Sequence, residues 1–224
     1  MSSQEIIKIS DFQIRLARSP RARHILLKQN VKGEIVLTYP RLCPKMLAIS
    51  FAKKQLPWIR AHVQYAPKEV VFHWGESVSI LGQKYLIQSG AQGHIENGCL
   101  FVSGAPEFCH RRVCAMAQKM LQSYLHQKIP ELVVRLGVKS GRVVLRNTSS
   151  RWGSCSSRKT LSFCWKIAFA PLDVIDYLIA HEVAHLKEMN HSSKFWAVVD
   201  SLVDHRKQSE RWLKENGRKL QAIR

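Results

Sequence analysis

The chain has 224 residues, 46% of them apolar, so it can build an ordinary hydrophobic core without depending on disulfide bonds. No apolar run approaches the roughly 18 residues of a membrane span, so we expect a soluble protein with no membrane partner. Thirty-five Lys and Arg against 16 Asp and Glu give a formal net charge of +19. Such a charge attracts anionic partners, whether nucleic acid, nucleotide phosphates or acidic proteins, although a solubilising surface would show the same excess.

The six cysteines form no C-x-x-C pair, and no secretory signal precedes them. We therefore expect a reduced, cytoplasmic protein whose cysteines are small buried hydrophobes. A cysteine-bound metal is not expected.

The first third of the chain predicts strands followed by a broken helix. Residues 12–19 and 22–29 have strand character, and a turn at 31–33 leads into a returning strand at 34–39. A helix is expected over 44–65, in two pieces because Pro57 removes a backbone donor.

Residues 70–103 return to strand character, divided by glycines. The expected domain boundary lies near Gly104, which makes 1–104 a β-rich N-terminal part and 105–224 a second domain. A long helix is predicted from Pro106 to Gln127, ended by Pro130 and followed by a short helix through ELVVRLG.

Two strand-like segments, 142–147 and 160–169, flank the polar stretch TSSRWGSCSSRK. We expect them to pair as a hairpin. Between Arg111 and Lys166 there are twelve basic residues and one acid, Glu131, so this region is the most basic part of the chain.

The segment PLDVIDYLIAHEVAHLKEM contains no Gly and no Pro after its first residue, which predicts a continuous helix. His181 and His185 are four residues apart, so both imidazoles lie on one face and can bind one metal ion. Glu182 lies about 100° around the helix, where it can reach a metal-bound water as general base without being a ligand.

His191 is the expected third ligand. On a continued helix it would lie roughly 240° from His185, so the helix must end before it. Asn190 suits a left-handed terminal residue, and Ser192 can cap a following helix. Three downstream carboxylates remain as alternatives: Glu210, Asp200 and Asp204.

The stretch RWGSCSSRKTLSFCWKIAFAPLDVIDYLIAHEVAHLKEMNHSSKFW resembles the signature of the bacterial YgjP-like metal-dependent hydrolases, which are grouped with zincin-type metallopeptidases. The resemblance implies an α+β protein: a small β-rich N-terminal part, then a zincin-like helical domain over 105–224 with an upstream β-hairpin. It also implies that His181, His185 and His191 bind the metal and that Glu182 is the catalytic acid/base. The chain is not a metzincin, because Glu188 stands in place of the turn glycine and no Met follows residue 189 to form a Met-turn.

Zinc chemistry alone does not name the substrate, since the ion can polarise either a carbonyl or a phosphoryl oxygen. A peptidase is the preferred interpretation, with an extended peptide added to the hairpin edge and with Arg151, Trp152 and Ser154 lining the cleft. These three residues could equally form a structural turn.

Two other functions compete with the peptidase interpretation. A zinc-dependent phosphohydrolase acting on nucleotides would use Arg146, Arg151, Arg158 and Lys166 as phosphate contacts, unless these side chains simply face solvent. A nucleic-acid-associated protein would use the basic N-terminal strands and the C-terminal helix, with zinc partly structural. Glu182 counts against a purely structural zinc, because a closed site needs no base.

Overall fold

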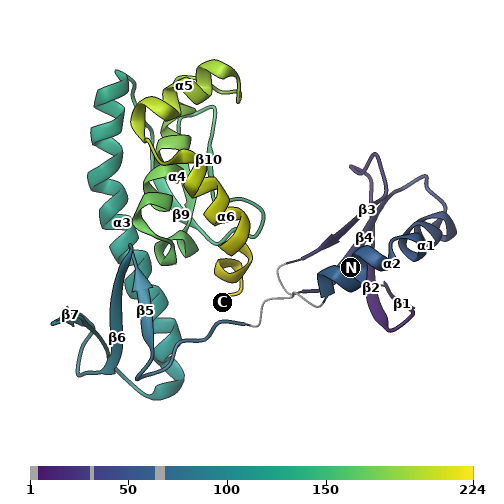
Figure 1. Ribbon diagram of the computed structural model, residues 1–224, viewed down its shortest axis with the longest axis horizontal. Helices are drawn as coiled ribbons and strands as arrows, with labels where there is room; N and C mark the ends of the chain where they lie inside the picture. The colour runs from purple at the N-terminus through teal and green to yellow at the C-terminus, as the bar shows by residue number, and fades with distance from the viewer. Residues whose placement is uncertain (1–4, 31–32, 64–68, 224) are drawn as a thin grey trace. The chain divides into compact units, whose positions relative to one another are not determined.

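The computed structural model describes residues 5–30, 33–63 and 69–223, which belong to two compact units, Met1–Glu69 and Val70–Arg224 (Figure 1). Both units contain strands and helices, which confirms the α+β class. Within these residues, no helix combines the length and the apolar character that crossing a membrane requires.

The first unit is a four-stranded sheet followed by two helices. Its elements are β1 (Glu5–Ile9), β2 (Phe12–Ser19), β3 (Leu26–Gln29), β4 (Ile35–Pro40), α1 (Lys45–Lys54) and α2 (Leu56–Val63). The strand order is β1-β2-β4-β3, with β2 and β4 parallel and both outer pairs antiparallel. The apolar residues of β2 and β4 pack with α1 and α2 into one core, in which Ile14, Leu37 and Ile59 are fully buried.

The sequence predicted β2, β3, β4 and the two helical pieces of this unit, but not β1. Strands β3 and β4 pair antiparallel, which confirms that the chain returns after the predicted turn; this turn includes Gly33 at φ 80°, while residues 31–32 lie outside the described part. The helix predicted over 44–65 forms two pieces separated at Gln55, with Pro57 in the first turn of α2, where a missing N–H is tolerated. The last predicted residues of that helix fall outside the described ranges.

The second unit contains two sheets and four α-helices among its described residues. Its elements are β5 (Ser77–Ile80), β6 (Gln83–Ser89), β7 (His94–Glu96), β8 (Cys99–Val102), η1 (Pro106–Phe108), α3 (Cys109–Leu136), β9 (Val143–Arg146), β10 (Gly153–Cys155), β11 (Leu161–Cys164), η2 (Trp165–Phe169), α4 (Leu172–Ala184), α5 (Ser193–Leu202) and α6 (Arg206–Gln221). The long helix α3 lies beside α4 (Figure 1), and the two belong to one hydrophobic core.

The boundary between the units lies at residues 69 and 70, whereas the sequence placed it near Gly104. The sheet β5-β6-β8-β7 buries Val78, Ile87 and Leu100 in the same core as α3 and α4, so it belongs to the second unit. The glycine-rich turns mark local chain reversals and carry no information about this packing.

Helix α3 continues through Pro130, which was predicted to end it. Proline there removes one backbone hydrogen bond, but Ile129 and Leu132 on either side are 2% exposed, and their burial holds the helix together. The helix ends instead at Gly137, which adopts a left-handed conformation with φ 64° and donates its N–H to the carbonyls of the last turn.

The sheet next to the motif helix has the order β10-β11-β9, which differs from the predicted hairpin. Strands β9 and β11 do pair, but they run parallel, because Gly153–Cys155 forms an intervening strand that pairs antiparallel with β11. Residues 165–169, predicted as the end of a strand, form the 3-10 helix η2. Strand β10 therefore lies at the edge of this sheet.

Candidate metal centre

Helix α4 carries two histidines of the HEVAH motif on one face. Because His181 and His185 are four residues apart, their ring centroids lie 5.1 Å from one another. The helix ends at Ala184 with His185 as its C-cap, before the predicted end at Met189. The carbonyl of Glu188 can only accept, so Nδ1–H of His185 donates to it at 3.1 Å. This bond leaves Nε2 of His185 as the atom that can bind a metal.

His191 joins the pair from the loop after α4. Its Nε2 lies 3.1 Å from Nε2 of His181, and potential ligand atoms of all three histidines lie within 4.8 Å of one another. Asn190 does not adopt the predicted left-handed conformation; its Oδ1 accepts a hydrogen bond from the backbone N–H of Ser192 at 3.2 Å. Ser192 is the N-cap residue of α5, as predicted, although no side-chain capping bond forms.

The three alternative ligands are engaged elsewhere. Glu210 accepts from the Tyr177 hydroxyl at 3.1 Å, Asp200 forms two hydrogen bonds with Arg206, and Asp204 contacts His205. None of these carboxylates belongs to the described histidine cluster.

Burial favours the neutral form of His181 and His185, which is the form that binds a metal. The pKa of His181 is lowered to about 4, mainly by burial and further by the neighbouring His185 and His191. Burial also lowers the pKa of His185, against the opposing effect of its bond to Glu188. In a tetrahedral zinc site with Zn–N bonds near 2.0–2.1 Å, ligand nitrogens lie about 3.3 Å apart. The Nε2 separation of His181 and His191 is close to this, so the donor set fits a zinc ion.

Two aromatic residues of α5 support the histidines. Phe195 is fully buried, and its ring centroid lies 5.0, 4.5 and 4.7 Å from those of His181, His185 and His191. Trp196 lies 5.7 Å from both His181 and His191. No local sequence pattern places Phe195 at the histidines, because its contact with them depends on how α5 packs against α4.

Arg206, the first residue of α6, connects Trp196 of α5 to the next helix. Its guanidinium lies 4.8 Å above the Trp196 ring and donates to both carboxylate oxygens of Asp200, at 2.5 and 3.2 Å. It also approaches Glu210 at 3.5 Å. Tyr177, which donates to Glu210, lies edge-on to His181 with 5.9 Å between ring centroids. Helices α4, α5 and α6 are thus tied together beside the histidine cluster.

Glu182 is buried, with 5% of its surface exposed, and faces Gly153 of β10. A Cβ at Gly153 would overlap the Glu182 carboxylate, so only glycine permits this approach. Oε2 of Glu182 has no hydrogen-bond partner among the described residues. Burial raises the pKa of Glu182 to about 7, although the positive charge of Arg151 opposes the shift. A buried carboxyl with a free oxygen and such a pKa suits proton transfer.

The predicted substrate residues fall into different environments. Arg151 is exposed, and its positive charge lowers the pKa of the Glu182 carboxyl group. Ser154 is half-buried on β10. Trp152 is half-buried against Gly217 of α6, which favours its structural interpretation. Arg146 and Arg158 are both exposed, at the end of β9 and in the turn between β10 and β11.

Lys166, proposed from the sequence as a phosphate contact, is buried at 7% exposure. Its Nζ donates to the carbonyl of Gln221 at 3.0 Å, so its charge supports the end of α6. Gly153 was not among the residues predicted for the site. Its position in RWGSCS, between the candidate residues Trp152 and Ser154, is the sequence feature that could have indicated it.

Comparison with known proteins gives a family and partly similar solved structures, among them two metallopeptidase zymogens. The metallopeptidase zymogen abylysin of Pyrococcus abyssi is 21% identical over 41% of this chain and 93% of its own, with a TM-score of 0.37. The zymogen jannalysin of Methanocaldococcus jannaschii is 19% identical over 41% of this chain and 94% of its own, also with a TM-score of 0.37. No curated protein sequence matches significantly. The model of the YgjP-like metallopeptidase domain matches residues 23–216, so the chain belongs to the YgjP-like metallopeptidase family.

Proposed function

We propose that the chain is a zinc-dependent peptidase in which His181, His185 and His191 bind the ion and Glu182 is the general base. The observation that carries this proposal is the convergence of three histidines beside a buried carboxyl group that faces an edge strand. Membership of a metallopeptidase family supports a metal-dependent peptidase as the activity class.

Each histidine contributes one ring nitrogen as a ligand. His185 is oriented by its bond to Glu188, and the aromatic ring of Phe195 packs against all three imidazoles. Bound zinc would supply a water of lowered pKa and polarise the carbonyl of the substrate.

Glu182 moves the proton. Its free Oε2 accepts a proton from the attacking water and returns it to the amine that leaves when the peptide bond breaks. General acid–base transfer of this kind typically contributes about 10²- to 10⁴-fold to the rate. Gly153 lets the carboxyl group lie directly against β10, where the substrate backbone would be held.

Strand β10 suits an extended peptide. Among the described strands it pairs with β11 alone, so its other edge offers backbone donors and acceptors for an added strand. Because β10 contacts α4 beside Glu182, a peptide paired there would pass next to the base. Ser154 and the exposed Arg151 would then contact substrate side chains.

The test is hydrolysis by the zinc-loaded protein with a panel of unfolded proteins, peptides and nucleoside triphosphates. We expect peptide cleavage that is lost in Glu182→Gln, while one equivalent of zinc is retained because the histidines are unchanged. His181→Ala/His185→Ala should bind no stoichiometric zinc. Glu182-dependent release of phosphate, with no peptide cleavage, would replace this proposal with a phosphohydrolase.

A further inference from the structure

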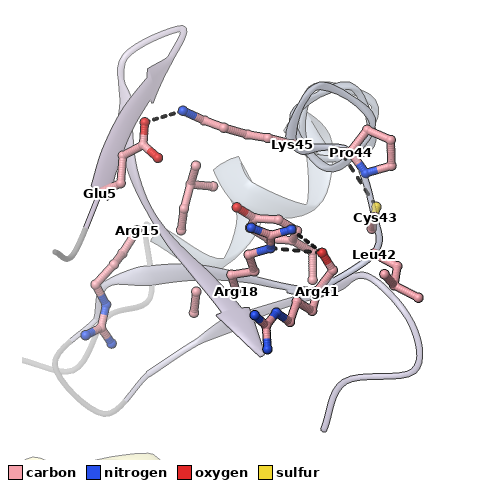
Figure 2. Close-up of a pocket in the computed structure, with 11 residues that line it drawn as sticks. Glu5, Arg15, Arg18, Arg41, Leu42, Cys43, Pro44 and Lys45 are labelled. Carbon is pink, nitrogen blue, oxygen red and sulfur yellow. Dashed lines mark hydrogen bonds and ion pairs between the residues drawn. The ribbon is translucent and has the colours of Figure 1, made fainter. Parts of the chain in front are cut away.

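The first unit contains a basic pocket that the proposed peptidase activity does not use. It has a volume of about 840 Å³ and is lined by Glu5, Arg15, Leu16, Ala17, Arg18, Tyr39, Arg41, Leu42, Cys43, Pro44 and Lys45. Figure 2 shows Arg41, Leu42, Cys43 and Pro44 in the turn that leads from β4 into α1, while Glu5 and Arg15 belong to strands β1 and β2. The pocket lies where the parallel strands β2 and β4 end together, at the paired residues Ser19 and Pro40.

Four cations and one acid line this pocket, which leaves it positively charged. Glu5, the acid, forms an ion pair with Lys45. Three arginines remain. Arg15 makes only a long contact with Glu34, at 3.8 Å, and its buried Nε has no hydrogen-bond partner in the described part of the chain.

Arg18 and Arg41 are arranged to present their charge to the pocket. Arg18 donates from both Nε and Nη2 to the backbone carbonyl of Arg41, which fixes the orientation of its guanidinium (Figure 2). The side chain of Arg41 is exposed and forms no ion pair or hydrogen bond with any described residue. Guanidinium groups that are fixed or unpaired in this way suit bidentate binding of phosphate.

The charge extends beyond the pocket itself. Arg21 and Arg23 lie exposed in the loop that follows β2, at the same end of the sheet. Residues 1–69 contain 13 Lys and Arg against 4 Asp and Glu, a formal net charge of +9. A field of this sign concentrates polyanions around the unit.

We infer that this pocket binds a single strand of nucleic acid through its phosphates, with Arg15, Arg18 and Arg41 as the main contacts. Every nucleotide carries a phosphate, so one strand can contact several of the arginines that line the pocket, whereas a polypeptide would need a run of acidic residues. The pocket is concave, with the buried Leu16 and Tyr39 among its lining residues, so a flexible strand can enter it more readily than a bilayer surface. Leu42, 97% exposed beside Arg41, offers apolar surface to a sugar or base.

The test uses the full-length protein and a fluorescently labelled single-stranded oligonucleotide of about 20 nucleotides. Binding is followed by fluorescence anisotropy over a series of salt concentrations. We expect Arg18→Ala/Arg41→Ala to weaken binding at least tenfold. It should also reduce the slope of log K against log salt by about 1.4, since each lost phosphate contact on a single strand contributes about 0.7.

The matched control is Lys53→Ala/Lys54→Ala, which removes two exposed charges from the far end of α1, outside the pocket. We expect it to weaken binding less than threefold. Arg41→Glu is a second variant that leaves the bonds of Arg18 intact, because those bonds use the backbone carbonyl of residue 41. It should lose binding while its circular dichroism spectrum is unchanged.

Three results would overturn the inference. Equal losses of affinity in both double variants would show that binding depends on the overall positive charge of the unit and not on the pocket. Absence of oligonucleotide binding at about 100 mM salt would rule out single-stranded nucleic acid as the ligand of the pocket. Vesicles containing phosphatidylserine, or polyglutamate, bound with dependence on Arg18 and Arg41 when the oligonucleotide is not, would assign the pocket to a different partner. None of these results depends on zinc or on Glu182.

Discussion

At the scale of single residues, the position of Gly153 requires one residue type as strictly as the positions of the three histidines do. An added methyl group would overlap the carboxylate of Glu182, so either the base or strand β10 must move. We expect Gly153→Ala to lower kcat by roughly 10²-fold, the size of effect that follows a displacement of about 1 Å at a reacting group. Zinc content should stay at one equivalent. Ser157→Ala, exposed in the turn between β10 and β11, is the control, and wild-type kcat in Gly153→Ala would contradict the role given to the glycine.

The sequence predicted which histidines meet, because helical periodicity places His181 and His185 together and the spacing of His191 requires an early helix end. The structure brings all three together. The left-handed conformation predicted for Asn190 was wrong, because a hydrogen bond between its side chain and the backbone of Ser192 forms the turn without a positive φ. The contact of Gly153 with Glu182 joins distant parts of the chain, and no local pattern reports it.

At the scale of elements, Arg206 connects the helix that follows His191 to the rest of the site. It stacks on Trp196 and binds Asp200, both on α5, while it belongs to α6. We expect Arg206→Ala to raise the dissociation constant for zinc by about 10- to 100-fold, the range found when residues that orient metal ligands are lost. Zinc affinity is measured by competition with a chelating dye.

Arg211→Ala is the matched control for Arg206→Ala, since Arg211 is an exposed arginine on the same helix. It should bind zinc like the wild-type protein. A Co²⁺-loaded sample adds a second readout, because a displaced ligand alters the visible absorption spectrum. Wild-type zinc affinity and an unchanged Co²⁺ spectrum in Arg206→Ala would show that α5 holds its place without this contact.

Element types were predicted better than their pairing. Strands do form within 142–147 and in the first half of 160–169, but the short β10 between them was predicted as a polar loop, so the direction of pairing was missed. Pro130 was predicted to end the helix because it removes a backbone hydrogen bond. The burial of Ile129 and Leu132 keeps α3 continuous instead. In both cases tertiary packing overrides a local preference.

At the scale of the whole molecule, the two units have separate cores. The first cluster lies within residues 7–59 and the second within residues 70–223. We therefore expect residues 70–224 to fold when expressed alone and to bind one equivalent of zinc. Aggregation of this fragment, or failure to bind zinc when the full chain does, would show that the second unit needs the first.

Metal removal should act on one unit only. Free zinc at 100 times its dissociation constant stabilises the folded state by about 2.7 kcal/mol, which corresponds to roughly 5–10 °C in the Tm of a domain of this size. In calorimetry of the full chain, EDTA should lower the Tm of the second unit by this amount and leave that of the first unchanged. Equal shifts in both transitions would indicate that the two units unfold together.

The chain enters and leaves the second unit at one place. Val70 and Ile223 form a parallel bridge, and the N–H of Val70 donates to the carbonyl of Ala222 at 3.1 Å. A short linker could therefore join these ends, and the unit could be opened instead at the exposed turn of Asn97 and Gly98 between β7 and β8. Such a circular permutant would keep the order of α4, its loop and α5, so the histidine cluster depends on this segment and not on where the polypeptide starts.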